Sequence, residues 1–275
     1  MNELYEKLKI KSVEVRCETL LIHKASPETR VASSLSCVEI FVALYYGGIL
    51  NFNAKVPFAE DRDRFVISKG HGSISMYPIL ADLGFFDKSE LNRVCHEGSF
   101  LGGIPDPIIP GYETVNGSLG HGFGVSSGMA IGLKRKGSNA SVFTLLGDGE
   151  INEGSNWEAM MFASHHSLDN LTAILDNNKV SMLDFSRNIL DLDPIIRKVE
   201  SFGFNLEIVD GHKVEDVYEA LKKFKSLRNG KPNFLIANTL KGKGAPQLET
   251  NPLSHILSLK PQEIDAILTG FNYVK

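Results

Sequence analysis

The sequence lacks several features that would indicate particular classes of protein. It has three cysteines, Cys17, Cys37 and Cys95, and their spacing matches no metal-ligand pattern. An odd cysteine count without a signal peptide is typical of a reducing compartment, so we expect a cytoplasmic protein. No apolar run approaches the roughly 20 residues needed to cross a membrane. The amino-terminal residues carry charges of both signs, unlike a targeting peptide.

Strong charge of one sign is also lacking. The formal net charge is −4, which gives no reason to expect binding to nucleic acid or to a membrane surface. The balance of apolar and charged residues, 43% and 23%, is that of an ordinary globular protein. A chain of 275 residues can form one large α/β domain or two small ones.

The most informative stretch runs from residue 142 to residue 178. Two short apolar runs, Val142–Leu146 and Leu171–Leu175, have the length and composition of buried strands. The residues between them have helical periodicity, and Ser155 with Glu158 three positions later predicts a capping box. We therefore expect a strand–helix–strand unit with parallel strands and a right-handed crossover.

Polar residues follow both of these strands. Asp148 lies in a Gly-Asp-Gly turn after the first strand, and Asn178 follows the second. Both should emerge at the carboxyl edge of the sheet, where such folds bind ligands. Asp, Asn and Gly also favour plain turns. Their presence at both tips nevertheless favours a site for Mg²⁺, with Ca²⁺ or Mn²⁺ as alternatives, because these ions prefer oxygen ligands. A metal-bridged phosphate is the expected ligand.

The remaining pattern extends this unit into one domain. Strands are predicted at 65–67, 142–146, 171–175, 205–209 and 233–239, and helices at 2–24, 36–46, 76–83, 88–95, 118–136, 191–202, 214–227 and from 261. We expect an α/β fold with a doubly wound, mostly parallel sheet of about five strands and helices on both faces. The Gly- and Pro-rich segment 97–117 is expected to be an ordered functional loop.

Four glycines recur at every fourth position of the predicted helix 118–136. They are Gly120, Gly124, Gly128 and Gly132, which would share one helix face. Each glycine costs about 0.5–1 kcal/mol in a helix interior. We therefore expect this face to pack closely on the sheet, and the amino end of the helix to offer free N–H groups to an anion.

These motifs resemble those of thiamine diphosphate enzymes, and of the transketolases in particular. The resemblance rests on GDG followed by NN, on the shape GDGxxxEGxxWEA, and on the segments SKGHG and GSLGHG. It covers nearly the whole chain. Its length is similar to that of the amino-terminal, diphosphate-binding half of transketolases made as two polypeptides. The resemblance implies that residues 1–275 form this single domain. The pyrimidine-binding domain would then lie on a partner chain, in an α2β2 heterotetramer.

The resemblance also implies roles for individual residues. Asp148, Asn178 and the carbonyl of Val180 match the family's metal ligands. Glu153 matches a glutamate at the interface between subunits, although an acidic residue also suits the first turn of a helix. With His71 and His255 it makes up the implied catalytic set. The implied cofactor contacts are His71, Gly117, Ser118, Leu119, Gly147, Asp148, Gly149, Glu150, Asn178 and Lys243.

The sequence departs from the family at positions that contact the sugar donor. Arg30 stands where the family has a histidine, and Ile104 replaces a second histidine. Near the carboxyl end, Ile256 follows the single histidine His255 where the family has a pair. Isoleucine cannot hydrogen-bond a hydroxyl group, and arginine suits a carboxylate or phosphate. We therefore expect altered donor specificity, with an acidic group near the reacting carbon of the donor.

Three functions remain open at this point. The favoured one is a transketolase-like subunit that moves a two-carbon ketol, or a related acyl unit, from a donor to an aldehyde acceptor. A second is the α subunit of a 2-oxoacid dehydrogenase, which shares the GDG and NN core. The third is a non-catalytic, cofactor-binding partner. The WEA and SKGHG segments favour the first.

Overall fold

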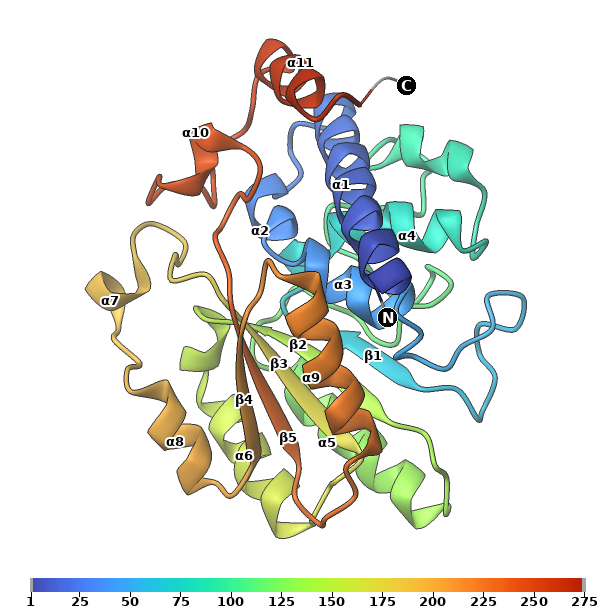
Figure 1. Cartoon of the computed structure of the whole chain (residues 1–275), viewed down its shortest axis with the longest axis vertical. Helices are drawn as coiled ribbons and strands as arrows, with labels where there is room; N and C mark the ends of the chain where they lie inside the picture. The colour runs from blue at the N-terminus through green and yellow to red at the C-terminus, as the bar shows by residue number, and fades with distance from the viewer. Residues whose placement is uncertain (1, 274–275) are drawn as a thin grey trace.

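Five short strands form one parallel sheet at the centre of the molecule (Figure 1). The computed structural model describes residues 2–273. The strands are β1 (Arg64–Ile67), β2 (Val142–Gly147), β3 (Leu171–Asn177), β4 (Asn205–Asp210) and β5 (Asn233–Asn238). Their order in the sheet is β1-β2-β3-β5-β4, with every neighbouring pair parallel. All five predicted strands are therefore present, each within two residues of its predicted ends.

The central strands are apolar throughout because both faces of the sheet are covered. Every residue of β2 and of β3 is buried, as expected for parallel strands between two helical layers. The register aligns the strand ends: Gly147 lies opposite Asp176, and Asn177 lies opposite Asn238. The polar residues that follow these strands consequently meet at one edge.

Helices cover both faces of the sheet. They are α1 (Asn2–Ala25), α2 (Val31–Leu35), α3 (Val38–Tyr45), α4 (Met76–Asp82), α5 (Gly122–Arg135), α6 (Gly154–His165), α7 (Ser186–Ile189), α8 (Ile195–Ser201), α9 (Val214–Ser226), α10 (Pro246–Glu249) and α11 (Pro261–Gly270). Three 3₁₀ helices, η1 (Gly70–Ser75), η2 (Lys88–Arg93) and η3 (Glu150–Asn152), complete the assignment for the described residues.

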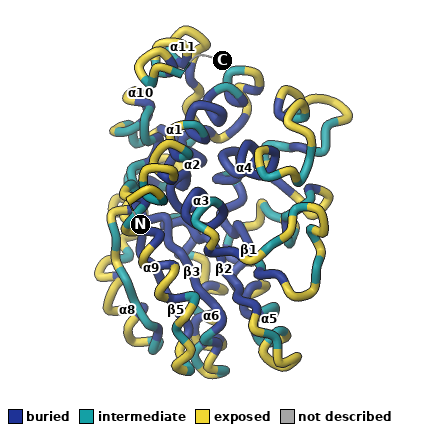
Figure 2. Tube along the Cα trace, turned by 45° about the vertical axis from the view of Figure 1, so that its right-hand side comes forward, coloured by how far each residue is buried: buried dark blue, intermediate teal, exposed yellow. Residues whose placement is uncertain are grey.

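Two apolar cores lie on opposite sides of the sheet. Helices α1, α3, α4 and α9 pack on one face, and α5, α6 and α8 pack on the other. A third, smaller cluster joins α10 and α11 to α1 and α2, at one end of the molecule (Figure 1). Figure 2 shows the central strands and the inner sides of these helices as buried and their outer turns as exposed. The predicted doubly wound α/β fold is confirmed.

The glycine-rich helix differs from the prediction. Helix α5 begins at Gly122, and Gly120 lies before it with φ of +83°. A Cβ atom on Gly124, Gly128 or Gly132 would meet no other atom within 4 Å. The expected tight packing of these glycines on the sheet is therefore wrong, because that face of α5 points away from the core. The sheet is instead contacted through buried residues such as Phe123.

Two helix starts also differ. Helix α6 has Glu153, not Ser155, at its N-cap, and no side chain caps it. The Ser155 hydroxyl instead donates a hydrogen bond to the carbonyl of Gly120 at 2.8 Å, so the predicted capping box with Glu158 is wrong. The helix predicted from residue 191 starts at Ile195, directly after Pro194. None of the helices within residues 2–273 is both long and apolar enough to cross a membrane.

Candidate active site

A cavity of about 320 Å³ lies at the carboxyl ends of β1, β2 and β3. Many of the residues singled out in the sequence line it, namely Arg30, His71, Ile104, Gly117, Leu119, Gly147, Asp148, Gly149, Glu150, Asn178, Val180 and His255. Four further residues also line it: Lys69, Ser181, Met182 and Lys241. Segments far apart in the chain therefore meet where a doubly wound sheet is expected to bind its ligand.

Asp148 and Asn178 follow adjacent strands and are nearly inaccessible to solvent. The carboxylate of Asp148 accepts hydrogen bonds from the Gly149 N–H at 2.9 Å and the Ser186 hydroxyl at 3.1 Å. Burial, together with the negative charge of Asp176, raises the pKa of Asp148. A buried carboxylate of this kind is stabilised in its charged form by a nearby cation.

The oxygen atoms around Asp148 suit a hard divalent cation. Asn178 and Val180 line the same cavity, and Asn178 Oδ1 accepts the Val180 N–H at 3.1 Å. No group of three or more His, Cys, Asp or Glu side chains is close enough to hold a metal within residues 2–273. A metal here would depend on a mixed set of carboxylate, amide and carbonyl oxygens, which is the type of site Mg²⁺ uses when phosphates complete its shell.

At both glycine positions of the Gly-Asp-Gly turn, packing favours a residue without a Cβ atom. A Cβ on Gly147 would lie 3.2 Å from Cδ of Lys69, and one on Gly149 would lie 3.1 Å from Oγ of Ser181. Glu150 fastens the same turn, since its carboxylate accepts the Gly147 N–H at 3.1 Å and the Gly120 N–H at 2.9 Å. Burial raises the pKa of Glu150.

The lysine after β5 that lines the cavity is Lys241, whereas Lys243 was predicted from the sequence. Lys241 is 3% exposed, and its ammonium donates to the Val180 carbonyl at 2.7 Å and to Nδ1 of His255 at 3.2 Å. Burial, assisted by the charge of Lys69, lowers its pKa to about 8. Lys243 is not among the residues that line the cavity. Both lysines follow β5 in one turn, and the sequence alone did not show which one points inward.

Arg16 and His212 hold the ends of the turn that carries Lys241. Nη1 of Arg16 donates to the Lys243 carbonyl at 2.6 Å, and Nε2 of His212 accepts the Leu240 N–H at 2.7 Å. Arg16 and His212 both bind the buried carboxylate of Glu39. Neither the arginine nor the histidine was singled out in the sequence.

Two histidine rings lie together in the cavity. The rings of His71 and His255 are T-shaped, with centroids 4.9 Å apart. Burial lowers the pKa of His71 to about 2 and that of His255 to about 4, with neighbouring lysines acting in the same direction. Both are therefore neutral imidazoles near pH 7, and each can donate one hydrogen bond and accept another.

Arg30 and Ile104, the residues that depart from the family, both line this cavity. The Arg30 side chain forms no hydrogen bond or ion pair with any of residues 2–273. Ile104 is 49% exposed. A Cβ atom on Gly70 would lie 3.4 Å from Cγ2 of Ile104. The cavity therefore has one unpaired guanidinium group and one exposed apolar side chain.

Three more of the predicted residues lie outside the lining of the cavity. Ser118 is exposed, and its hydroxyl is 3.1 Å from Nδ1 of His121. Glu153 is exposed at the start of α6, beside Gly120. Ile256 is 44% exposed.

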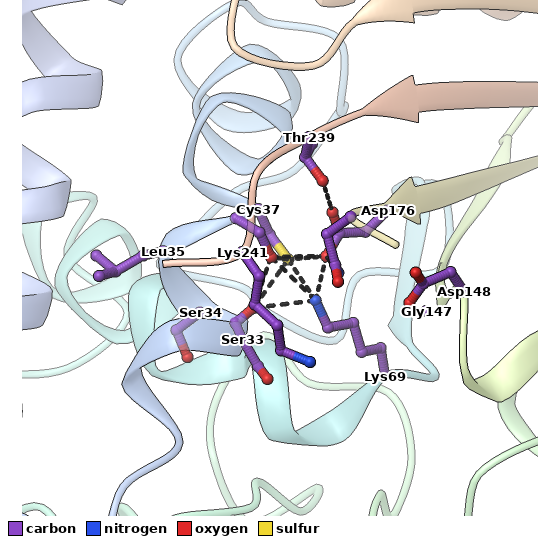
Figure 3. A network of polar contacts seen from close by, with 12 residues as sticks. Ser33, Ser34, Leu35, Cys37, Lys69, Gly147, Asp148, Asp176, Thr239 and Lys241 are labelled. Carbon is purple, nitrogen blue, oxygen red and sulfur yellow. Dashed lines mark hydrogen bonds and ion pairs between the residues drawn. The ribbon is translucent and has the colours of Figure 1, made fainter. Parts of the chain in front are cut away.

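A buried ion pair beneath the cavity was not predicted. Lys69 follows β1 and contacts Asp176, the penultimate residue of β3, and both are almost fully buried (Figure 3). Each lies in or beside a motif that was examined for other residues, SKGHG and DNN. The sequence signal that could have identified this ion pair is the presence of a charged residue at the end of each of two apolar strands.

Comparison with known proteins identifies relatives over nearly the whole chain. The family described as transketolase, thiamine diphosphate binding domain, matches residues 31–274. An apulose-4-phosphate transketolase subunit of Actinobacillus succinogenes is 37% identical over 269 residues, which cover 97% of this chain and 96% of its relative. The 6-deoxy-6-sulfo-D-fructose transketolase subunit of Clostridium sp. is 36% identical over 230 residues, covering 83% of each chain.

Solved structures agree with this relationship. Transketolase from Campylobacter jejuni superimposes with a TM-score of 0.89 and 27% identity over 97% of this chain. The present chain spans 43% of the length of that transketolase. These relatives do not favour the alternative of a 2-oxoacid dehydrogenase subunit. The chain belongs to the transketolase family, as a counterpart of its thiamine diphosphate-binding domain, and its class of reaction is thiamine diphosphate-dependent ketol transfer.

Proposed function

We propose that the chain binds thiamine diphosphate through Mg²⁺ and acts in carbohydrate metabolism as one subunit of a two-chain transketolase. The observation that carries this proposal is the set of hard oxygen ligands around Asp148, in the same cavity as two neutral histidines. When bound, the cofactor supplies the nucleophilic carbon and the electron sink needed to break a carbon–carbon bond beside a carbonyl group.

The chain's own residues would bind and orient these groups. Asp148, Asn178 and the Val180 carbonyl would hold the metal, with Ca²⁺ or Mn²⁺ as substitutes for Mg²⁺. The diphosphate would lie against Gly149 and Lys241, both of which line the cavity. The remaining proposed cofactor contacts in the lining are His71, Gly117, Leu119, Gly147 and Glu150. Ser118, which lies between two of them in the chain but outside the lining, is proposed with them.

His71 and His255 are the proposed proton-handling groups. As neutral imidazoles they can hydrogen-bond the hydroxyl groups of a donor and pass a proton at a ring nitrogen. Nδ1 of His255 accepts from Lys241, which leaves Nε2 as the nitrogen that carries the proton and can donate it. The lowered pKa values of both rings keep them neutral, so each ring retains an acceptor atom for a donor hydroxyl.

A partner subunit would complete the enzyme. Relatives that are named as transketolase subunits support a partner, and the partner expected here carries the pyrimidine-binding domain in an α2β2 assembly. Glu153 is exposed beside Gly120 and is proposed to meet acidic groups at the interface with this partner. The three cysteines are free, which suits a cytoplasmic location.

The donor is proposed to carry an acidic group near its reacting carbon. Arg30 lines the cavity without a protein partner for its charge, and a guanidinium binds carboxylate or phosphate oxygens in a forked arrangement. Ile104 offers no hydrogen bond to a sugar hydroxyl at the position where the family has a histidine. If so, Arg30→Ala raises the donor KM and leaves the affinity for thiamine diphosphate unchanged. An unchanged donor KM would contradict this part of the proposal.

The proposed activity is tested by product analysis. The chain is purified with its partner subunit, supplied with thiamine diphosphate and Mg²⁺, and given xylulose 5-phosphate and ribose 5-phosphate. Formation of sedoheptulose 7-phosphate that is lost in Asp148→Ala supports ordinary ketol transfer. Asp265→Ala, which removes a surface ion pair with Lys24, is the matched control and should remain active. If no product forms although cofactor is bound, this donor and acceptor pair is excluded, and donors with an acidic group near the reacting carbon, or deoxy donors, are tested next.

A further inference from the structure

The buried ion pair between Lys69 and Asp176 contacts one of the proposed metal ligands. Lys69 and Asp176 are 1% and 0% exposed, and they lie beside the turn that carries Asp148 (Figure 3). Lys69 lines the cavity and Asp176 lies behind it, yet the proposed function gives the pair no role. Replacing such a pair by apolar residues is often neutral or stabilising, so stability alone gives little reason for its presence.

Asp176 is surrounded by hydrogen-bond donors. Its Oδ2 atom accepts from the Ser36 hydroxyl at 2.7 Å and from Nδ2 of Asn178 at 3.0 Å, and Oδ1 accepts from the Thr239 hydroxyl. The Lys69 ammonium pairs with the same carboxylate. Every one of these neighbours presents a hydrogen atom to it, so the oxygens of Asp176 act as acceptors.

An acceptor-only neighbour decides which way the Asn178 amide turns. The amide has a donor end and an acceptor end, and only its NH₂ group can face the Asp176 carboxylate. The amide oxygen must then point the other way, where it accepts the Val180 N–H at 3.1 Å. A carbonyl-type oxygen has two lone pairs, so this oxygen retains one for a cation.

We propose that Lys69 and Asp176 are positioning residues that hold the Asn178 amide with its oxygen available to a metal ion at Asp148. This inference rests on the metal site of the proposed function. Lys69 contributes to this arrangement in two ways. Its ammonium forms the ion pair that fixes the Asp176 carboxylate in place, and its stem packs against Gly147, the residue before Asp148. Side chains beyond the direct ligands commonly fix ligand orientation in metal sites, and their loss typically costs 10–100-fold in metal affinity.

The test uses paired substitutions that leave the net charge unchanged. Lys69→Met with Asp176→Leu removes both charges and the acceptor, whereas Lys69→Met with Asp176→Asn removes both charges and keeps an amide oxygen facing Asn178. The readout is the dissociation constant of Mn²⁺, measured by electron paramagnetic resonance on the full chain. The chain is assembled with its partner and saturated with thiamine diphosphate. Thermal unfolding of each variant is recorded in parallel.

We expect the Met/Leu variant to lose about 10–100-fold in Mn²⁺ affinity and the Met/Asn variant to recover most of that loss. Lys225→Met with Asp63→Leu is the matched control, since it removes a partly buried ion pair far from the cavity. Asp63 directly precedes β1, at the opposite end of that strand from the cavity, and Lys225 belongs to α9. This control should destabilise the fold without changing the Mn²⁺ affinity.

The outcomes separate this inference from the proposed function. Unchanged affinity in the Met/Leu variant overturns the inference, and so does a Met/Asn variant that is as weak as Met/Leu. A change in the control as large as that in Met/Leu would mean that general destabilisation is the cause, which also overturns it. If the Asp148→Ala variant binds Mn²⁺ as tightly as the wild type does, the proposed metal site itself is wrong and this inference fails with it.

Discussion

His23 should make the protein sensitive to mild acid, although it lies outside the candidate active site. It is fully buried near the end of α1. Its Nδ1 atom is 2.8 Å from the Thr29 hydroxyl, which itself donates to the Ser26 carbonyl at 2.8 Å. Its Nε2 atom accepts the Leu259 N–H at 3.1 Å. The ring therefore carries its proton on Nδ1 and cannot take a second one without losing the bond to Leu259.

The size of the effect follows from the two pKa values of His23. Burial lowers its pKa from 6.5 to about 4 in the folded chain. The unfolded chain therefore binds a proton more readily, and the stability of the folded state falls as pH drops from 6.5 towards 4. Each pH unit in this interval is worth about 1.4 kcal/mol. Between pH 7.5 and pH 5 the free energy of unfolding should fall by about 2 kcal/mol because of His23 alone.

The measurement is urea unfolding at both pH values, followed by the fluorescence of the single tryptophan, Trp157, which packs against Phe202. His23→Gln keeps an acceptor for the Leu259 N–H but cannot be protonated. Its stability should fall about 2 kcal/mol less than that of the wild type between the two pH values. His71 and His255 titrate in both proteins, so their contribution cancels. Exposed His96→Gln is the control and should behave as wild type. Equal pH dependence in His23→Gln and wild type would refute the reasoning.

Three further predictions concern glycines and the core. Gly128→Ala meets open space on α5, so urea unfolding of the isolated chain should show a gain of about 0.4–1 kcal/mol, whereas a loss would show that the site is crowded. Gly120→Ala forces a side chain into a backbone with φ of +83°, and its Cβ would lie 2.6 Å from that of Glu153. It should lower the free energy of unfolding by at least about 2 kcal/mol, and a neutral result would contradict the close contact between this turn and Glu153. Phe143→Ala, in fully buried β2, should cost about 3–5 kcal/mol in the same assay with no change in thiamine diphosphate affinity per folded molecule; a loss below about 1 kcal/mol would mean that the strand is not central to the core.

The sheet could be predicted from the sequence because its strands are short apolar runs. Val142–Gly147 and Leu171–Asn177 are buried on both faces, so periodicity was not needed to recognise them. Asp148 and Asn178 were brought to one cavity by the parallel arrangement alone. To predict that these two residues lie close together, it was enough to recognise a strand, a helix and a second strand in succession.

Other features depend on contacts that the sequence does not show. The regular spacing of the glycines in α5 predicted a common face correctly, but it did not reveal that this face points to open space. Ser155 is spaced as a cap, yet a contact with Gly120 uses its hydroxyl. The choice between Lys241 and Lys243 depends on how one turn is held by Arg16 and His212, residues more than 20 positions away in the chain.

The two sides of the cavity are built from different kinds of backbone. Asp148 and Asn178 each come immediately after a strand, so the hydrogen bonds of the sheet determine where they start. Arg30 instead directly precedes the short helix α2, and Ile104 and His255 lie in two irregular segments. Loops accept substitutions and insertions more readily than strands do. The substrate range of such a protein can therefore diverge during evolution while its cofactor chemistry is inherited unchanged, since a mutation in one side need not disturb the other.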